Sequence, residues 1–227
     1  MNQVMSSKSS AERLIKAGSA LNMTLQATEI EKLLHYVDQL HLWNKTYNLT
    51  AVRNPDAMLV QHIFDCLSVI KPLETYLAKV VSPQRTVLDV GSGAGLPGIV
   101  IATMMPNTQV ECVDTVDKKA SFIRQMAGVL ELPNLIANHA RIEQLPPKNC
   151  SVVISRAFAS IQDFIAVAGQ HVGEHGALVA MKGLYPGEEL KQIETNNAWA
   201  LFKTEELKIP ELNAHRCMIW LTRNTQP

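Results

Sequence analysis

Aromatic side chains are scarce in this chain of 227 residues, at 5%, and its formal charges cancel, with 21 Lys and Arg against 21 Asp and Glu. So few aromatics argue against a broad stacking platform for single-stranded nucleic acid. The balanced charge argues against a non-specific polyanion binder, whose affinity comes mainly from many phosphate contacts. A local basic patch is compatible with both observations.

Cysteines and long apolar runs are also few. The chain has four scattered cysteines without a CxxC motif: Cys66, Cys112, Cys150 and Cys217. This usage predicts reduced core residues in a cytoplasmic protein. The first residues, MNQVMSSKSS, lack the apolar segment of a secretion signal, and no run approaches the roughly 20 apolar residues of a membrane helix. We therefore expect a cytoplasmic protein that crosses no membrane.

Residues 1–82 predict an N-terminal helical cap. The stretch NPDAMLVQHIFDCLSVI has helical periodicity, with Pro55 at its start and Lys71-Pro72 at its end. The polar stretch WNKTYNLTAVR before it predicts a loop. An earlier helix is expected from a stripe of apolar residues in TEIEKLLHYVDQL, namely Ile30, Leu33, Leu34, Val37 and Leu40.

From about residue 85 short apolar runs alternate with helical stretches. The runs RTVLDV, TQVECVD, NLIANHA, SVVISRA and GALVAMK are apolar on both faces, as in a parallel sheet covered by helices. Two further strand-like runs follow in the last fifty residues, with no clear helix between them. We predict an α/β fold in which residues 83–227 form a doubly wound, mostly parallel seven-stranded sheet, with the cap packed on it as one compact unit.

A glycine-rich loop follows the first of these runs. Asp89, Gly91, Gly93 and Gly95 form the pattern D-x-G-x-G-x-G. Glycines at these positions let the chain turn sharply and bring backbone N–H groups close to a ligand. Because Gly93, Gly95 and Gly98 also satisfy GxGxxG, the pattern alone leaves a dinucleotide site open.

Two acidic residues favour S-adenosylmethionine over a dinucleotide. Asp89, two positions before the first glycine, would repel a pyrophosphate and attract an ammonium group such as that of the methionyl end. Asp114 ends the second strand-like run, where a carboxylate can accept both ribose hydroxyls of either cofactor. We therefore predict a methyltransferase, with a nicotinamide-dependent oxidoreductase as one alternative.

Four stretches together resemble one known family. DVGSGAGLPGIVIA, HLWNKTYNLTAVR, HIFDCL and ISRAFAS resemble the bacterial small-subunit ribosomal RNA guanine-N7 methyltransferases, also known as the glucose-inhibited division protein B family, over residues 10 to 222. The resemblance implies the class I S-adenosylmethionine-dependent methyltransferase fold. It also implies methylation of N7 of the guanine at position 527, in the 530 loop of 16S rRNA, within the 30S subunit or its precursor. One departure is Cys66, which follows Asp65 where the family usually has serine, a better hydrogen-bond partner.

The resemblance further implies which residues bind the cofactor. These are Gly91 and Leu96 of the glycine loop, with Gly93 shaping it, and Ile142 and Glu143 of ARIEQL, which are expected against the adenine. Arg156 of ISRAFAS is expected at the edge of the cofactor pocket, past the fourth strand. A salt bridge that ties this strand to a neighbour is the alternative interpretation of Arg156.

Methylation at guanine N7 needs little catalytic machinery. N7 carries a lone pair and no proton, so we predict no general base and assign Arg156 a positioning role, because guanine presents O6 and N7 acceptors that arginine can read. Positioning alone can supply roughly 7–11 kcal/mol of such a barrier. Two other functions share this fold: a small-molecule methyltransferase, and a non-catalytic cofactor-binding factor in ribosome assembly.

The RNA contacts are expected at Arg53, His62 and Lys182. Arg53 lies in the polar cap loop, and Lys182 ends the fifth strand-like run. His62 and Asp65 lie three apart on a helix, which fits a hydrogen-bonded structural pair, an RNA contact or part of a metal site. We predict no metal, because no third ligand has suitable spacing, and we expect a monomer.

Overall fold

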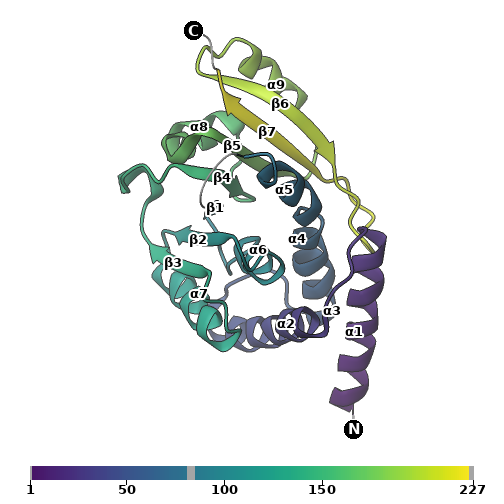
Figure 1. Cartoon of the computed structure of the whole chain (residues 1–227). Helices are drawn as coiled ribbons and strands as arrows, with labels where there is room; N and C mark the ends of the chain where they lie inside the picture. Colours follow the sequence, from purple (N-terminus) through teal and green to yellow (C-terminus); the bar gives the residue numbers. More distant parts are fainter. Residues whose placement is uncertain (1, 81–84, 225–227) are drawn as a thin grey trace.

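The computed structural model describes residues 2–80 and 85–224, and a seven-stranded sheet lies at its centre (Figure 1). The strand order is β3-β2-β1-β4-β5-β7-β6. Strands β1 to β5 are parallel, and β7 and β6 add an antiparallel pair at one edge. The predicted Rossmann-like sheet is therefore confirmed. The strands are β1 (Thr86–Val90), β2 (Gln109–Asp114), β3 (Leu135–His139), β4 (Cys150–Ser155), β5 (Val172–Lys182), β6 (Trp199–Glu206) and β7 (Cys217–Arg223).

Helices cover both faces of the sheet. The helices α6 (Gly98–Met104) and α7 (Asp117–Val129) pack on one face, and α8 (Ile161–Ala168) and α9 (Gly187–Glu194) pack on the other. Successive strand residues enter different cores: Val87 belongs to the first and Leu88 to the second, and both are buried. This double burial explains why the strands read as unbroken apolar runs.

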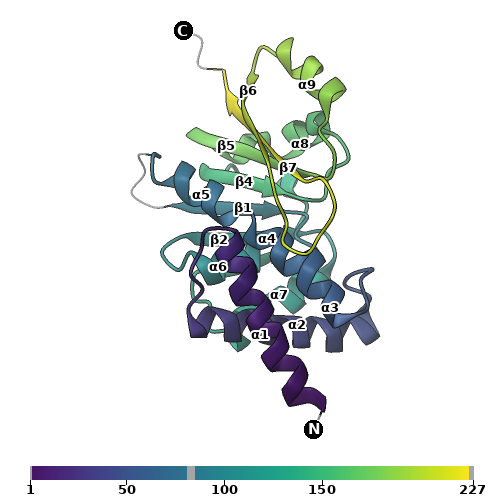
Figure 2. The same ribbon diagram turned by 90° about the vertical axis from the view of Figure 1, so that its right-hand side faces the viewer.

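The N-terminal helices lie on the α6 side of the sheet, and two of them, α2 (Ala27–Tyr47) and α4 (Asp65–Leu67), contact α6 (Figure 2). In α2, Leu33, Val37 and Leu40 are buried, as the stripe predicts. They belong to the same continuous apolar core as residues of α6 and of the sheet. The predicted boundary between residues 82 and 83 lies outside the described residues. Within residues 2–80 and 85–224, no helix combines the length and hydropathy that a membrane span requires.

The third part of the cap, residues 55–77, is not the single helix that its periodicity suggests. It consists of α3 (Pro55–Met58), the π-helical turn η1 (Leu59–Phe64), α4 (Asp65–Leu67) and α5 (Ile70–Leu77). The prediction that Lys71-Pro72 ends the helix is wrong. The helix breaks before α5, and Pro72 lies in the first turn of α5, where a missing N–H leaves no hydrogen bond unmade. The π-helical turn carries His62, and π-turns are frequent at functional sites.

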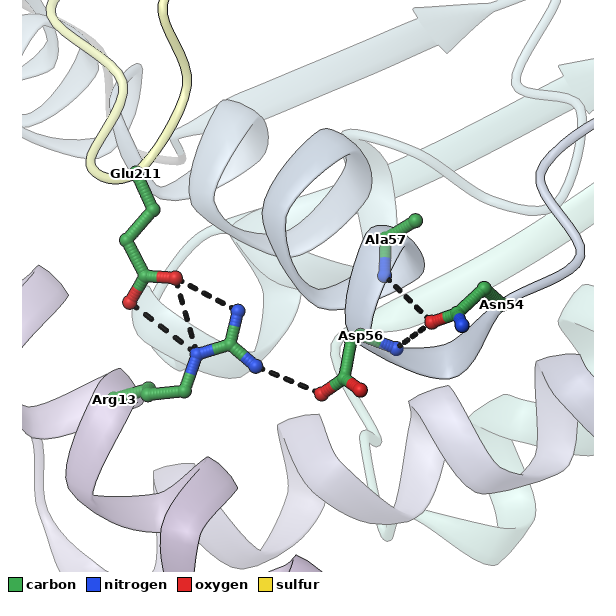
Figure 3. A network of polar contacts seen from close by, with 5 residues as sticks. All are labelled: Arg13, Asn54, Asp56, Ala57 and Glu211. Carbon is green, nitrogen blue, oxygen red and sulfur yellow. Dashed lines mark hydrogen bonds and ion pairs between the residues drawn. The ribbon is translucent and has the colours of Figure 1, made fainter.

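A polar network joins two segments of the cap to residues 207–216 (Figure 3). Arg13 lies on α1 (Asn2–Ala20), and its guanidinium contacts Glu211 at 2.7 Å and Asp56 at 2.8 Å. Glu211 belongs to residues 207–216, the loop that connects β6 to β7, and Asp56 lies in the first turn of α3. Asn54 caps α3 by accepting hydrogen bonds from the two N–H groups that follow Pro55. Arg13 thus holds the 207–216 loop against the cap.

Candidate active site

The glycine loop follows β1, and its glycines have a backbone conformation that other residues adopt with difficulty. Gly91, Gly93 and Gly95 have φ angles of 70°, 60° and 88°. A Cβ atom on Gly91 would lie 2.8 Å from the Cβ of Ala157, so this position also needs the space that glycine leaves. The Gly91 N–H donates to the carbonyl of Val113 at 2.8 Å, which ties the loop to the end of β2.

Asp89 supports the loop from below and does not line a cavity. Its side chain is fully buried, and Oδ2 accepts a hydrogen bond from the N–H of Gly98 at 2.9 Å, at the start of α6. Burial raises the pKa of this carboxyl group to about 7. Its Oδ1 has no hydrogen-bond partner in the part of the chain that the structure describes. The geometry points to a role in holding the loop to α6, in place of the contact with a ligand ammonium that the sequence led us to expect.

A cavity of about 370 Å³ opens at the carboxyl ends of β1 to β4, and we call it the cofactor cavity. It is lined by Gly91, Asp114, Ile142 and Glu143, so the structure brings these four predicted residues together. Ile142 and Glu143 lie in the 3-10 turn η2 (Ile142–Gln144). The buried ring of His171 fixes this turn, because its Nε2 contacts the carbonyl oxygen of Ile142 at 2.9 Å.

Asp114 is the acid of the cofactor cavity. It is 6% exposed, and its Oδ2 accepts from the N–H of Gly93 at 2.8 Å while its Oδ1 accepts from the N–H of Val116 at 2.9 Å. A carboxylate oxygen has a second lone pair, so each oxygen can still accept one hydroxyl. Asp114 therefore shapes the glycine loop and leaves acceptor capacity for a ribose.

A second cavity of about 470 Å³ adjoins the first, and we call it the acceptor cavity. The two cavities share Gly91 and Ala157, whereas Gly93 and Leu96 line the acceptor cavity alone. Its remaining walls come from the cap, from the ends of β4 and β5, and from the C-terminal pair of strands. Its polar side chains are Thr50, Gln61, His62, Asp65, Ser92, Arg156, Lys182 and Arg216.

Asp65 holds two arginines at the wall of the acceptor cavity. Its Oδ2 accepts from Nη1 of Arg156 at 2.8 Å, and its Oδ1 accepts from Nε of Arg216 at 3.1 Å. The carboxylate is 5% exposed and the two arginine side chains are 25% and 30% exposed. Arg156 therefore forms a salt bridge, as in the alternative interpretation, and it lines the acceptor cavity and not the cofactor cavity at whose edge the sequence placed it. Removing one partner of such a buried pair leaves an uncompensated charge.

His62 faces the acceptor cavity but does not pair with Asp65, so the predicted structural pair is wrong. Its Nε2 lies 2.9 Å from Oγ1 of Thr50, and its Nδ1 has no partner among the described residues. Burial, with help from the nearby Arg156 charge, lowers the pKa of His62 to about 4, so the ring is neutral at pH 7. The described residues contain no group of three or more His, Cys, Asp or Glu side chains that could hold a metal ion.

Lys182 lines the acceptor cavity, but its ammonium is occupied. The side chain is 11% exposed, and Nζ donates to the carbonyl of Ala159 at 2.6 Å and lies 3.3 Å from Oε1 of Glu189. Lys182 therefore fixes the loop that follows β4, and it is not the free rim cation that its position in the sequence suggested.

Arg53 lies outside both cavities. It is exposed, and its guanidinium donates to the carbonyl of Asn44 at 3.1 Å and to Oδ1 of Asn48 at 2.7 Å. These contacts hold the cap loop to the end of α2. Cys66 is fully buried in the apolar core, so the side chain at this position does not contact RNA directly.

Comparison with known proteins decides the family. The family model described as GidB, rRNA small subunit methyltransferase G, matches residues 29–219. The chain belongs to this family. It is 54% identical over 215 residues to the ribosomal RNA small subunit methyltransferase G of Bordetella pertussis, and the aligned region covers 94% of each chain. It is 44% identical over 210 residues to the protein of the same name from Leptothrix cholodnii, covering 92% of this chain and 94% of the other.

Solved structures agree on the fold of this GidB family chain. A SAM-dependent methyltransferase from Aquifex aeolicus superposes with a TM-score of 0.54 at 16% identity, covering 74% of this chain and 93% of the other. TrmN from Thermus thermophilus gives a TM-score of 0.52 at 16% identity, covering 73% and 53%. The chain has the class I fold and is an S-adenosylmethionine-dependent methyltransferase, so the oxidoreductase alternative is excluded.

Sequence reasoning about this GidB family chain missed Arg216 and the Thr50–Gln61 wall of the acceptor cavity. Arg216 lies in AHRCMIWLTRN, which has only the signal of a strand. Its partner Asp65 is 151 positions away, and no local pattern connects the two. Thr50 lies in a polar loop and Gln61 in the π-helical turn η1, and no local pattern in the sequence distinguishes these two side chains from their neighbours.

Proposed function

We propose that this chain transfers a methyl group to N7 of a guanine in 16S rRNA, at position 527 of the 530 loop. The observation that supports this most directly is the pair of adjoining cavities that share Gly91 and Ala157. One is suited to a nucleoside cofactor, and the other is walled by two guanidinium groups and large enough for one nucleotide. A base that enters the acceptor cavity meets the cofactor cavity at the glycine loop.

The residues present fit S-adenosylmethionine in the cofactor cavity. Asp114 has acceptor capacity for ribose hydroxyls, and Ile142 offers an apolar wall for a flat adenine ring. Glu143 lines the same cavity, and Gly91 allows close approach of the backbone where the two cavities meet. When bound, S-adenosylmethionine supplies a methyl group that its sulfonium makes electrophilic.

The protein residues position the base and exclude water. Guanine N7 has a lone pair and no proton, so no base is needed. The acidic and imidazole groups of the acceptor cavity are poor bases, because the pKa of His62 is lowered to about 4 and Asp65 is engaged by both arginines. A donor on N7 would block the methyl group, so we assign the Arg156 contact to the neighbouring O6. Orientation of this kind can contribute roughly 7–11 kcal/mol to the barrier reduction.

The RNA lies over the cap and the mouth of the acceptor cavity in this proposal. His62 contacts the nucleotide in the cavity, and Arg53 contacts the RNA backbone from the exposed cap loop. Lys182 acts indirectly, by holding the loop after β4 in place. We further propose that the cap and the sheet act as one compact monomer in the cytoplasm, with the 30S subunit or its precursor as the substrate.

Methyl transfer to ribosomal particles tests the proposal. Labelled S-adenosylmethionine is supplied with 30S subunits from a strain that lacks this activity, with naked 16S rRNA and with fully modified 30S subunits. We expect incorporation only into unmodified RNA or particles, at a single N7-methylguanosine. Transfer to a small molecule alone would favour the small-molecule alternative. Cofactor binding without any transfer to RNA would favour the non-catalytic assembly factor.

A further inference from the structure

Two neighbouring side chains beside the acceptor cavity are unusually exposed for their type. Leu184 and Tyr185 are 74% and 63% exposed, the highest values among the large apolar side chains that the structure describes. They lie in the loop between β5 and α9, directly after Lys182 and Gly183. Single exposed apolar residues need no explanation, but an adjacent pair beside a proposed substrate site points to a contact.

These two residues line a groove of about 540 Å³, which we call the outer groove. Gly183, Arg216 and Cys217 line both the outer groove and the acceptor cavity. The outer groove thus adjoins the place where the target guanine is proposed to bind, and Arg216 belongs to the wall that the two have in common.

The charges of the outer groove suit a nucleotide at one end. Arg216 brings a cation to the shared wall. The carboxylate of Glu205 is offset by Nζ of Lys203 at 3.0 Å, and it also accepts from the indole N–H of Trp220 at 2.8 Å. Glu206 is exposed and would repel a phosphate, so a phosphate in the groove has to lie closer to the guanidinium of Arg216 than to this carboxylate.

The size of the outer groove favours a base over a protein. Stable protein interfaces bury about 1,200–2,000 Å² in total, and two side chains on one loop provide a small fraction of that area. An aromatic ring beside a cation, on the other hand, is the usual means of holding one unstacked base of single-stranded RNA. The nucleotides next to a base drawn out of its stack are the groups that need such support.

We propose that Leu184 and Tyr185 form a stacking surface for the base of a nucleotide adjacent to the target guanine, with Arg216 beside the phosphate that connects the two. This inference rests on the proposed function and adds a second contact for single-stranded RNA. It concerns one base, which agrees with the small number of aromatic residues in the chain.

Substitutions at position 185 test this surface on unmodified 30S subunits. Tyr185→Ala is expected to raise KM for the particle about 10-fold, because stacking on an aromatic ring contributes roughly 1–3 kcal/mol per base. Tyr185→Phe keeps the ring, so its KM is expected to equal that of the protein without substitutions. Phe202→Ala removes another exposed aromatic side chain, one that lines neither cavity nor the outer groove, and serves as the matched control. The affinity for S-adenosylmethionine should be the same in all four proteins.

A photoreactive phenylalanine analogue at position 185 then identifies the contact directly. Cross-linking to 16S rRNA next to the methylated guanine supports the proposal. Cross-linking to a ribosomal protein overturns it, as does a Tyr185→Ala variant with unchanged KM. If the protein without substitutions methylates the particle and Tyr185→Ala has the same KM, only this inference fails. If the protein without substitutions methylates no RNA, the proposed function itself fails.

Discussion

The cofactor cavity and the acceptor cavity differ in how the chain builds them. The walls of the cofactor cavity come from residues 90–167, from the ends of consecutive parallel strands. The acceptor cavity takes walls from residues 49–65, from the glycine loop, from the ends of β4 and β5, and from residues 207–217. Its central contacts join Asp65 to arginines that are 91 and 151 positions away. The proposed cofactor site is thus built from one continuous part of the sequence, whereas the proposed substrate site is built from segments far apart in it.

Replacing Arg156 should have the largest effect, and it should reduce methyl transfer much more than cofactor binding. In Arg156→Ala, kcat/KM for unmodified 30S subunits is expected to fall about 100-fold or more, as when a preorganised donor is removed from an active site. Cofactor affinity should be largely retained, because Arg156 lines the acceptor cavity and not the cofactor cavity. Methyl transfer and equilibrium cofactor binding are measured side by side, with the exposed Arg124→Ala as a control. Near-normal transfer would contradict the role of Arg156.

Replacing Asp114 should produce the opposite pattern. In Asp114→Ala the Kd for S-adenosylmethionine is expected to rise about 10- to 100-fold, since hydrogen bonds to a charged group contribute roughly 1.5–3 kcal/mol. Calorimetry measures this change, and kcat at saturating cofactor should change much less. Asp117→Ala removes an exposed acid that lines neither cavity and is the matched control. A Kd that is equal in both variants would exclude Asp114 as a cofactor ligand.

His62, at the acceptor cavity, and Asp89, beneath the glycine loop, should contribute to the pH dependence of stability with opposite signs. His62 stays neutral in the folded chain down to about pH 4, whereas its ordinary pKa is 6.5, so its contribution to stability is lost as the pH falls from 6.5 to 4. Asp89 keeps its proton in the folded chain up to about pH 7, whereas its ordinary pKa is 3.8, so its contribution is lost as the pH rises from 3.8 to 7.

Single substitutions separate these opposing contributions. In His62→Gln the free energy of unfolding should fall more steeply as the pH rises from 4 to 6.5, because the His62 contribution that opposes the Asp89 effect is removed. In Asp89→Asn it should rise more steeply over the same range. Each change is expected to reach about 1–3 kcal/mol. Urea unfolding at a series of pH values measures both slopes, and equal slopes in the two variants would refute this assignment.

The smallest effect is expected at Arg13, which is remote from both cavities. Arg13→Ala should raise KM for the particle about 2- to 5-fold and lower the free energy of unfolding by less than about 1 kcal/mol, as for partly exposed ion pairs. The KM effect follows because Glu211 belongs to the loop that ends at Arg216. Glu211→Gln should reproduce it, whereas Asp56→Ala should leave KM unchanged. Equal KM values in all three variants would show that the network acts only on stability.

Much of the fold and of the cofactor cavity follows from local sequence. The periodicity of the strands, the spacing of Gly91 and Gly93, and the position of Asp114 one strand later are all set within a single βαβ unit. The same local reasoning gave Asp89 the wrong environment. Its position in the motif is correct, but alternation along β1 directs its side chain toward α6, where it accepts from Gly98.

The residues of the acceptor cavity show where this reasoning stops. Lys182 ends a strand, as predicted, but the carbonyl of Ala159 and the carboxylate of Glu189 occupy its ammonium. His62 and Asp65 have helical spacing, yet a π-helical turn and partners from distant segments decide what each contacts. Such contacts depend on how the cap, the sheet and the last two strands pack together, and this packing cannot be predicted from any one short segment of the sequence.

The loop of residues 207–216 also has a consequence for protein synthesis. Because translation proceeds from the N-terminus, the segments that line the cofactor cavity are all available once residue 167 has left the ribosome. The acceptor cavity lacks one wall until Arg216 and Cys217 have emerged and the loop has closed onto Arg13. Among the segments that line either cavity, the one that completes the acceptor cavity is therefore synthesised last.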